Sequence, residues 1–279
     1  MAKVIKLGDA ELDLSRLVVM GILNVTPDSF FDGGCYMSEA NIIGRIHQIV
    51  EEGAAIIDVG AYSSRPGAEY VDEKEELSRL SLAVELIRKY EPQAFVSIDT
   101  FRSKVAAEIV SCLGAVIVND ISGGTMDEQM FEFVARTKVP YVMMHIQGTP
   151  QTMQKHPVYE DIVREVRTFF TERIARLTAM GFHQIILDPG FGFGKTLAHN
   201  YELMNGMDSY RDLDCPLLVG ISRKSMIYKL LGGTPDDSLN GTTVLNTISL
   251  MKGAQILRVH DVREAVEAVR ILEALKGGG

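Results

Sequence analysis

Polar side chains end many of the apolar runs in this 279-residue chain. These residues are Asn24, Asp58, Asp99, Asn119, Asp120, His145, Asp188, Ser222, Arg223, Lys224, Arg258 and His260. Acids and amides accept hydrogen bonds from N–H and O–H groups, whereas Lys, Arg and His can hold an anion. Any one of them could instead cap a helix, bond a turn or satisfy a buried contact. Together they favour a binding site with an acceptor-rich side and a cationic side.

The apolar runs predict eight strands, because each is short, β-rich and followed by a segment with helical spacing. The expected strands are residues 18–23, 55–60, 95–99, 115–119, 140–145, 184–188, 216–221 and 254–259. Strands that alternate with helices predict a parallel sheet, and eight such units fit a closed (β/α)₈ TIM barrel of the α/β class. The polar residues would then share the rim where such barrels place their active sites.

No linker or composition shift divides the sequence, so we expect a single domain over residues 1–279 with a short N-terminal extension. The alternative is an open doubly wound sheet, which would need an edge and a switch point. Gly190-Phe191-Gly192-Phe193-Gly194 lacks the G-x-G-x-x-G spacing, so dinucleotide binding loses its main support. Capping-box spacing predicts helix starts at Thr125, with Glu128 three residues on, and at Asp261, with Glu264.

Composition and charge narrow the choice of partners. The net charge is −9 and no Lys/Arg-rich run is present, so we expect no nucleic acid partner. No stretch approaches 18 consecutive apolar residues, so we expect no membrane segment and a cytoplasmic protein. Cys35, Cys112 and Cys215 are too few and too scattered for a disulfide framework, and we expect free thiols.

The loops after the first two predicted strands, residues 26–34 and 61–67, are rich in Gly, Pro and Ser. Loops of this composition can close over a ligand, but ordinary surface connections have the same composition.

Eight motifs, in order, resemble those of the dihydropteroate synthases, a pterin-binding enzyme family. They are Gly21-Ile22-Leu23-Asn24-Val25-Thr26-Pro27-Asp28-Ser29-Phe30, Ser64-Arg65-Pro66-Gly67, Ser97-Ile98-Asp99-Thr100, Val118-Asn119-Asp120, Met144-His145 with Gln147-Gly148-Thr149-Pro150, Asp188-Pro189-Gly190-Phe191-Gly192-Phe193-Gly194-Lys195, Gly220-Ile221-Ser222-Arg223-Lys224-Ser225 and Arg258-Val259-His260. The resemblance extends from about residue 18 to 261. Ala61-Tyr62-Ser63-Ser64 departs from the family's usual Gly-Glu-Ser-Thr, and Phe31 stands where Ser is common. These departures concern the shape of the aminobenzoate pocket and the response to sulfonamides.

The resemblance implies a reaction and a set of residues. The reaction condenses 6-hydroxymethyl-7,8-dihydropterin pyrophosphate with p-aminobenzoate to give 7,8-dihydropteroate and pyrophosphate. The implied pterin-binding residues are Asp99, Asn119, Met144, Asp188, Gly220 and Lys224. The implied p-aminobenzoate-binding residues are Phe30, Ser64, Arg65, Pro66, Phe193 and Ser225. The implied pyrophosphate-binding residues are Asn24, Ser64, Arg258 and His260, and Mg²⁺ would be held by Asn24 and Asp32.

The implied catalytic residues are Asp99, Asp188, Lys224, Arg258 and His260. We expect the C–O bond to break largely before attack, because the methylene cation is conjugated with the pterin ring. Anionic acids would stabilise that cation while Mg²⁺, Arg258 and His260 stabilise the departing anion. Two alternatives share these pterin-facing residues: a pterin-binding methyltransferase domain, and a non-catalytic pterin-binding paralogue. The resemblance also implies a homodimer.

Overall fold

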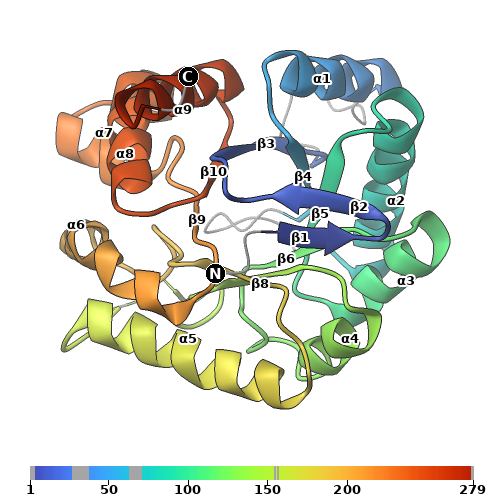
Figure 1. Ribbon diagram of the computed structural model, residues 1–279, viewed down its shortest axis with the longest axis horizontal. Helices are drawn as coiled ribbons and strands as arrows, with labels where there is room; N and C mark the ends of the chain where they lie inside the picture. The colour runs from blue at the N-terminus through green and yellow to red at the C-terminus, as the bar shows by residue number, and fades with distance from the viewer. Residues whose placement is uncertain (1–3, 27–37, 63–70, 154, 156, 278–279) are drawn as a thin grey trace.

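The strands form a closed parallel barrel surrounded by helices (Figure 1). The computed structural model describes residues 4–26, 38–62, 71–153, 155 and 157–277. The barrel strands are β3 (Val18–Asn24), β4 (Ile56–Gly60), β5 (Phe95–Asp99), β6 (Ile117–Asp120), β7 (Tyr141–Met144), β8 (Ile185–Asp188), β9 (Leu218–Val219) and β10 (Ile256–Val259). Their order is β8-β7-β6-β5-β4-β3-β10-β9, and a parallel bridge between Leu187 and Leu217 joins the two ends. The predicted barrel is confirmed, and the open-sheet alternative is wrong.

Helices follow the strands and cover the outside of the barrel (Figure 1). They are α1 (Glu39–Glu51), α2 (Glu73–Tyr90), α3 (Ser103–Leu113), α4 (Met130–Thr137), α5 (Ile162–Ala179), α6 (Leu197–Gly206), α7 (Ser225–Leu231), α8 (Leu239–Met251) and α9 (Val262–Leu275), with 3₁₀ segments η2 (Met207–Leu213) and η3 (Pro235–Ser238). Amphipathic spacing explains their packing: in α1, Ile42, Ile46 and Ile49 recur every three or four residues and are buried. Within the described residues, none of these helices has the length and apolar character needed to cross a bilayer.

The two predicted helix starts have different outcomes. Asp261 does precede α9, but its side chain pairs with Arg223 instead of capping the helix. The start at Thr125 is wrong, since α4 begins at Met130. The Thr125 hydroxyl donates to the Ser122 carbonyl, and the Asp127 carboxylate accepts from the backbone N–H of Ser103. Those contacts shape a turn in place of a first helical turn.

An N-terminal hairpin closes one end of the barrel. Its strands are β1 (Val4–Leu7) and β2 (Ala10–Asp13), which pair antiparallel and lie across the barrel in Figure 1. Ile5, Leu12 and Leu14 are buried against the inward-facing residues at the amino ends of the strands. That inner cluster also contains Val18, Met20, Ile56, Ile117, Val142, Ile186, Leu218 and Ile256. The amino end of the barrel is thus filled with apolar side chains. The polar residues that end the strands lie at the opposite, carboxyl end.

Candidate active site

Arg258, on β10, lies at the centre of the polar cluster at the carboxyl end. Its Nε donates to Asp58 Oδ2 at 2.6 Å, and its Nη2 donates to Asp99 Oδ2 at 3.0 Å. The backbone order explains the contacts, because β10, β3, β4 and β5 are consecutive neighbours in the sheet. One guanidinium therefore bridges acids from two different strands.

Asp58, on β4, also contacts the amide of Asn119, on β6. Asn119 Nδ2 donates to Asp58 Oδ2 at 3.1 Å, so a single carboxylate oxygen accepts from both Asn119 and Arg258. An ionised carboxylate only accepts hydrogen bonds, which requires the Asn119 side chain to turn its nitrogen toward Asp58. The Asn119 carbonyl oxygen is thereby left to accept from another group. Asp58 is fully buried, and its Oδ1 has no hydrogen-bond partner among the described residues.

Asp188 and Lys224 form the neighbouring part of the cluster. Asp188 Oδ1 accepts from the backbone N–H of Gly190 at 2.8 Å. Lys224 Nζ donates to the Phe191 carbonyl at 2.5 Å and lies 4.6 Å from the centre of the Phe193 ring. Phe193 packs against an apolar cluster that contains Met144. A cation, an acid and an aromatic face therefore meet beside one another.

Glycines leave room for these side chains. A Cβ added to Gly192, whose φ is +85°, would lie 3.3 Å from Lys224 Cδ. Gly220 lies against Arg258, with an added Cβ 3.7 Å from Arg258 Cβ. The glycine-rich motif after β8 thus permits close packing around the lysine, as well as a left-handed backbone.

Burial changes the protonation of the charged groups. It raises the pKa of Asp99 to about 7, with Arg258 opposing the rise and Asp58 adding to it. Burial also raises the pKa of Asp188, and Lys224 opposes that rise. The pKa of Lys224 is lowered to about 8 by burial, against the effect of Asp188. The charges of Asp99, Asp188, Lys224 and Arg258 thus affect one another's protonation.

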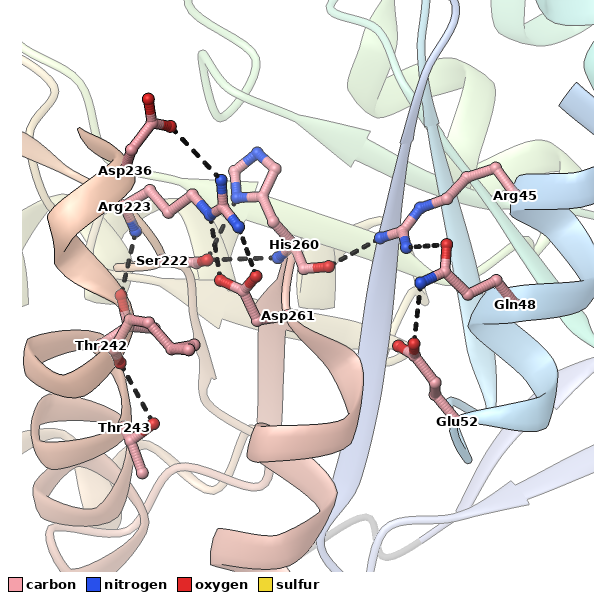
Figure 2. A network of polar contacts seen from close by, with 11 residues as sticks. Arg45, Gln48, Glu52, Ser222, Arg223, Asp236, Thr242, Thr243, His260 and Asp261 are labelled. Atoms are coloured by element: carbon pink, nitrogen blue, oxygen red, sulfur yellow. Dashed lines mark hydrogen bonds and ion pairs between the residues drawn. The ribbon is translucent and has the colours of Figure 1, made fainter. Parts of the chain in front are cut away.

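His260 lies two residues beyond Arg258 and is held by the loop after β9 (Figure 2). Its backbone N–H donates to Ser222 Oγ at 3.2 Å, and its Nδ1 is 3.1 Å from the same oxygen. Arg45, on α1, donates to the His260 carbonyl at 2.6 Å. Burial lowers the pKa of His260 to about 4, and Arg258 and Arg223 add to the effect. His260 is therefore neutral at pH 7.

Asp120 and His145, two of the polar residues expected at the rim, make contacts that stabilise the fold. Asp120 accepts from Ser122, Gly124 and the Tyr141 hydroxyl, which occupies both carboxylate oxygens. His145 is buried with its ring 4.9 Å from that of Phe169 on α5, so it packs toward the helical layer. Both side chains are thus engaged in contacts within the protein, although the charge of Asp120 still adds to the raised pKa of Asp99.

Sequence reasoning assigned no role to Lys195, which holds the glycine-rich loop after β8. Its buried Nζ donates to the carbonyls of Gly190 at 2.8 Å and Phe193 at 2.9 Å, and lies 3.0 Å from His145 Nδ1. Burial lowers its pKa well below the usual value. None of these contacts is with a carboxylate. The only feature of the sequence that could have indicated a role for Lys195 is its position at the end of the Gly-rich motif. Lys195 fixes the loop that presents Phe193.

Several predicted residues lie outside the described residues: Phe30, Asp32, Ser64, Arg65 and Pro66. Asn24 is described and ends β3. A Cβ on Gly60 would lie 3.0 Å from Asn24 Oδ1, so glycine at this position leaves space beside that oxygen. Ser225 is the first residue of α7, directly after Lys224. In the described part of the chain, no three His, Cys, Asp or Glu residues gather as a metal-binding group.

A closed barrel with buried acids, an amide and cations at its carboxyl end is the arrangement of a (β/α)₈ enzyme active site. The family model described as "Pterin binding enzyme" matches residues 20–260, and the chain belongs to this family. The Escherichia coli (strain K12) dihydropteroate synthase is 46% identical over 94% of this chain and 93% of its own length. The Synechocystis enzyme of the same name is 43% identical over 93% of this chain and 90% of its own.

Solved structures give the same result. The Yersinia pestis dihydropteroate synthase with a sulfonamide drug complex has a TM-score of 0.90 at 42% identity, covering 98% of this chain and 99% of that one. The Xanthomonas albilineans enzyme with 4-aminobenzoic acid also has a TM-score of 0.90, at 35% identity, with 98% of each chain covered. The function of this chain is that of a dihydropteroate synthase, a transferase of folate synthesis. The predicted family and enzyme class are confirmed, in preference to the methyltransferase and non-catalytic alternatives.

Proposed function

We propose that the cluster around Arg258 is where dihydropterin pyrophosphate and p-aminobenzoate are condensed to 7,8-dihydropteroate and pyrophosphate. The observation that supports this most directly is the bridge from Arg258 to Asp58 and Asp99, because it puts a cation beside acceptors for a donor-rich ring. Solved structures of two relatives contain fitting ligands: 4-aminobenzoic acid in the Xanthomonas albilineans enzyme and a pterine-sulfa conjugate in the Yersinia pestis enzyme.

The pterin would bind between Asp188 and Asn119. Among the described residues, Asp188 accepts one protein hydrogen bond, on Oδ1, so lone pairs remain for adjacent N–H donors of the pterin. Asn119 presents its carbonyl oxygen, because Asp58 holds its nitrogen. Lys224 would donate to the pterin carbonyl, and Asp99 would lie near the other ring. Met144, Phe193 and Gly220 would provide the surface against it.

Pyrophosphate would be held by Arg258 and a neutral His260. The Ser222 hydroxyl accepts from the His260 backbone N–H, so its own proton is available for His260 Nδ1. That arrangement favours the tautomer with a proton on Nε2, which can donate to an anion. Arg258 keeps its charge, since Asp58 and Asp99 raise its pKa despite burial. Ser64 would complete the anion site by family resemblance.

Asn24 and Asp32 would hold Mg²⁺, in keeping with the family resemblance. The space that Gly60 leaves beside Asn24 Oδ1 suits a cation held by one protein oxygen, phosphate oxygens and water. When bound there, Mg²⁺ would neutralise diphosphate charge.

The C–O bond to pyrophosphate would break first, and the leaving oxygen would keep the electron pair. Anionic Asp99 and Asp188 would stabilise the resulting methylene cation. The amine lone pair of p-aminobenzoate would then form the C–N bond, and the ammonium product would lose its proton to water. Phe30, Ser64, Arg65, Pro66, Phe193 and Ser225 would shape the p-aminobenzoate pocket, and we infer that sulfonamides compete for it.

The test is pyrophosphate release from dihydropterin pyrophosphate and p-aminobenzoate, measured in a coupled assay with and without Mg²⁺. Release that requires both substrates, and Mg²⁺, supports the proposal. If pyrophosphate is released neither with nor without Mg²⁺, the proposal is contradicted. Release without p-aminobenzoate would indicate hydrolysis and contradict the condensation.

We also infer that the chain forms a homodimer through α7, α8 and α9. Exposed apolar residues recur on these helices: Leu230, Leu231, Leu239, Val244, Met251, Ile271 and Leu275. In α8, Val244 and Met251 are seven residues apart and share a face. Such a patch is typical of a protein interface. Sedimentation of wild type and of Met251→Glu would test it: a dimer that dissociates in the variant supports the proposal, and a monomeric wild type contradicts it.

A further inference from the structure

Arg223 joins the loop after β9 to the loop after β10 (Figure 2). Its Nε donates to Asp261 Oδ2 at 3.0 Å, and its Nη2 donates to Asp261 Oδ1 at 2.5 Å. Its Nη1 also lies 3.9 Å from Asp236 Oδ1. Two parallel bonds between a guanidinium and a carboxylate fix orientation as well as distance. The pair therefore sets how the two loops lie against each other.

The backbone of Arg223 is strained. Its φ is +56°, in the left-handed region that residues other than glycine rarely adopt. The Arg223 N–H donates to Thr242 Oγ1, on α8, at 3.2 Å. The other non-glycine residues with positive φ in the described chain, Lys138 and Asp214, cap the ends of α4 and η2, where this conformation is common. Strain of this kind persists where surrounding contacts hold it, often at functional sites.

The neighbours of this pair are residues of the proposed active site. Ser222, which bonds His260, comes directly before Arg223, and Lys224 comes directly after it. Asp261 in turn follows His260. On the far side of His260, Arg45 donates to the His260 carbonyl (Figure 2). The Arg223–Asp261 pair thus connects the lysine assigned to the pterin with the histidine assigned to pyrophosphate.

We propose that Arg223 is a positioning residue, which sets the separation of Lys224 from His260 through its two bonds to Asp261. It acts through these residues, and it need not touch substrate. The proposal rests on the roles proposed above for Lys224 and His260. Bond breaking requires the pterin and the pyrophosphate to be held at once, so an error in this separation affects the transition state more than the binding of either substrate.

The test is Arg223→Gly, assayed as the purified full-length enzyme with both substrates. Glycine adopts this backbone conformation without strain, so we expect a Tm close to that of wild type while the bonds to Asp261 are lost. We expect kcat to fall about 10- to 100-fold, with each KM changed by less than about threefold. Arg223→Lys keeps a charge beside Asp261 but lacks the planar fork, and should recover part of the lost kcat.

Lys138→Gly is the matched control, because it relieves the same kind of strain at the end of α4 and should keep wild-type kcat. A folded Arg223→Gly with wild-type kcat overturns the proposal, as does a loss of kcat equal to the loss of folded protein. If Arg223→Gly does not fold, Asp261→Asn decides by the same criteria, since it weakens the pair and leaves the Arg223 backbone intact. An inactive wild-type enzyme would contradict the proposed function instead, which separates the two failures.

Discussion

The two ends of the barrel are filled by opposite kinds of side chain. At the amino end, Ile5, Leu12 and Leu14 of the hairpin region pack against apolar residues inside the strands. At the carboxyl end, Arg258 bridges Asp58 and Asp99, and Lys224 influences Asp188. Buried apolar side chains need no hydrogen-bond partners, whereas buried charges cost free energy unless they are paired. The amino end therefore contributes mainly to stability, whereas the carboxyl end holds charges whose burial costs free energy.

The buried acids at the carboxyl end are only partly compensated by cations. Asp58 Oδ1 is buried without a hydrogen-bond partner among the described residues, and the pKa of Asp99 is raised to about 7. One guanidinium serves two carboxylates, so negative charge remains uncompensated when both are ionised. This uncompensated negative charge would stabilise a cation that develops in the substrate. The charge that is costly to bury would therefore favour the reaction.

Asp188→Ala should have the largest effect, on pterin affinity. The carboxylate is the proposed acceptor for two pterin donors, and charged hydrogen bonds in a buried site are worth about 1.5–3 kcal/mol each. We expect binding to be lost in calorimetry with a pterin ligand. Asp208→Ala, in a largely exposed pair with Lys252, is the control and should bind normally. Wild-type affinity in Asp188→Ala would remove Asp188 from the pterin site.

Arg258→Ala should come next, lowering turnover far more than pterin affinity. It removes a cation from the departing pyrophosphate and leaves Asp58 buried without its charged partner. Breaking a buried pair in this way costs roughly 3–5 kcal/mol, so urea unfolding should also show a lower stability. Arg167→Ala removes an exposed pair with Asp212 and should cost about 0–1 kcal/mol, with unchanged turnover. Unchanged turnover in Arg258→Ala would reject its assignment to pyrophosphate.

The pH dependence of kcat/KM tests the raised pKa of Asp99. Its active form is the anion, so the rate should rise with pH through about 7. The active form of Lys224 is the cation, so the rate should fall again above about 8. Asp99→Asn should be slower and should lose the acidic limb, while keeping the alkaline one. An acidic limb that persists at the same pH in Asp99→Asn would assign it to another group.

The apolar half of this comparison could be predicted from sequence, because its pattern is local. Strand β5 matches the expected 95–99, and most other strands differ by one or two residues. The run 216–221 is an exception, since only Leu218–Val219 forms a strand. The spacing of apolar residues along the chain indicates which side chains are buried. The order of the resulting strands and helices then predicts the barrel.

The polar half could be predicted only in part. Spacing placed Asp99, Asp188, Lys224 and Arg258 at strand ends, but it could not show which groups pair. The bond from Arg258 to Asp58 joins residues 200 apart in sequence, and that from Lys195 to His145 joins residues 50 apart. The first depends on the pairing of the last barrel strand with the first, and the second on the packing of the loops after β7 and β8, so both arise only from tertiary structure. For the same reason the capping-box spacing at Thr125 misled, since a contact from Asp127 to Ser103 overrides it.

Leu12→Ala should have the smallest effect on catalysis, and it tests the claim that the two ends act separately. Leu12 is 6% exposed in the inner apolar cluster at the amino end, and removing such a side chain costs about 2–5 kcal/mol of stability. That cluster is built from apolar residues toward the amino ends of the strands, whereas the proposed site lies at their carboxyl ends. We therefore expect a lower urea midpoint with kcat and both KM values unchanged for the folded enzyme. Leu82→Ala, at a 41% exposed position on α2, should change neither stability nor kinetics. If Leu12→Ala lowered kcat of the folded enzyme, packing at the amino end would be shown to set the geometry of the charged rim, and the two ends would have to be treated as one coupled unit.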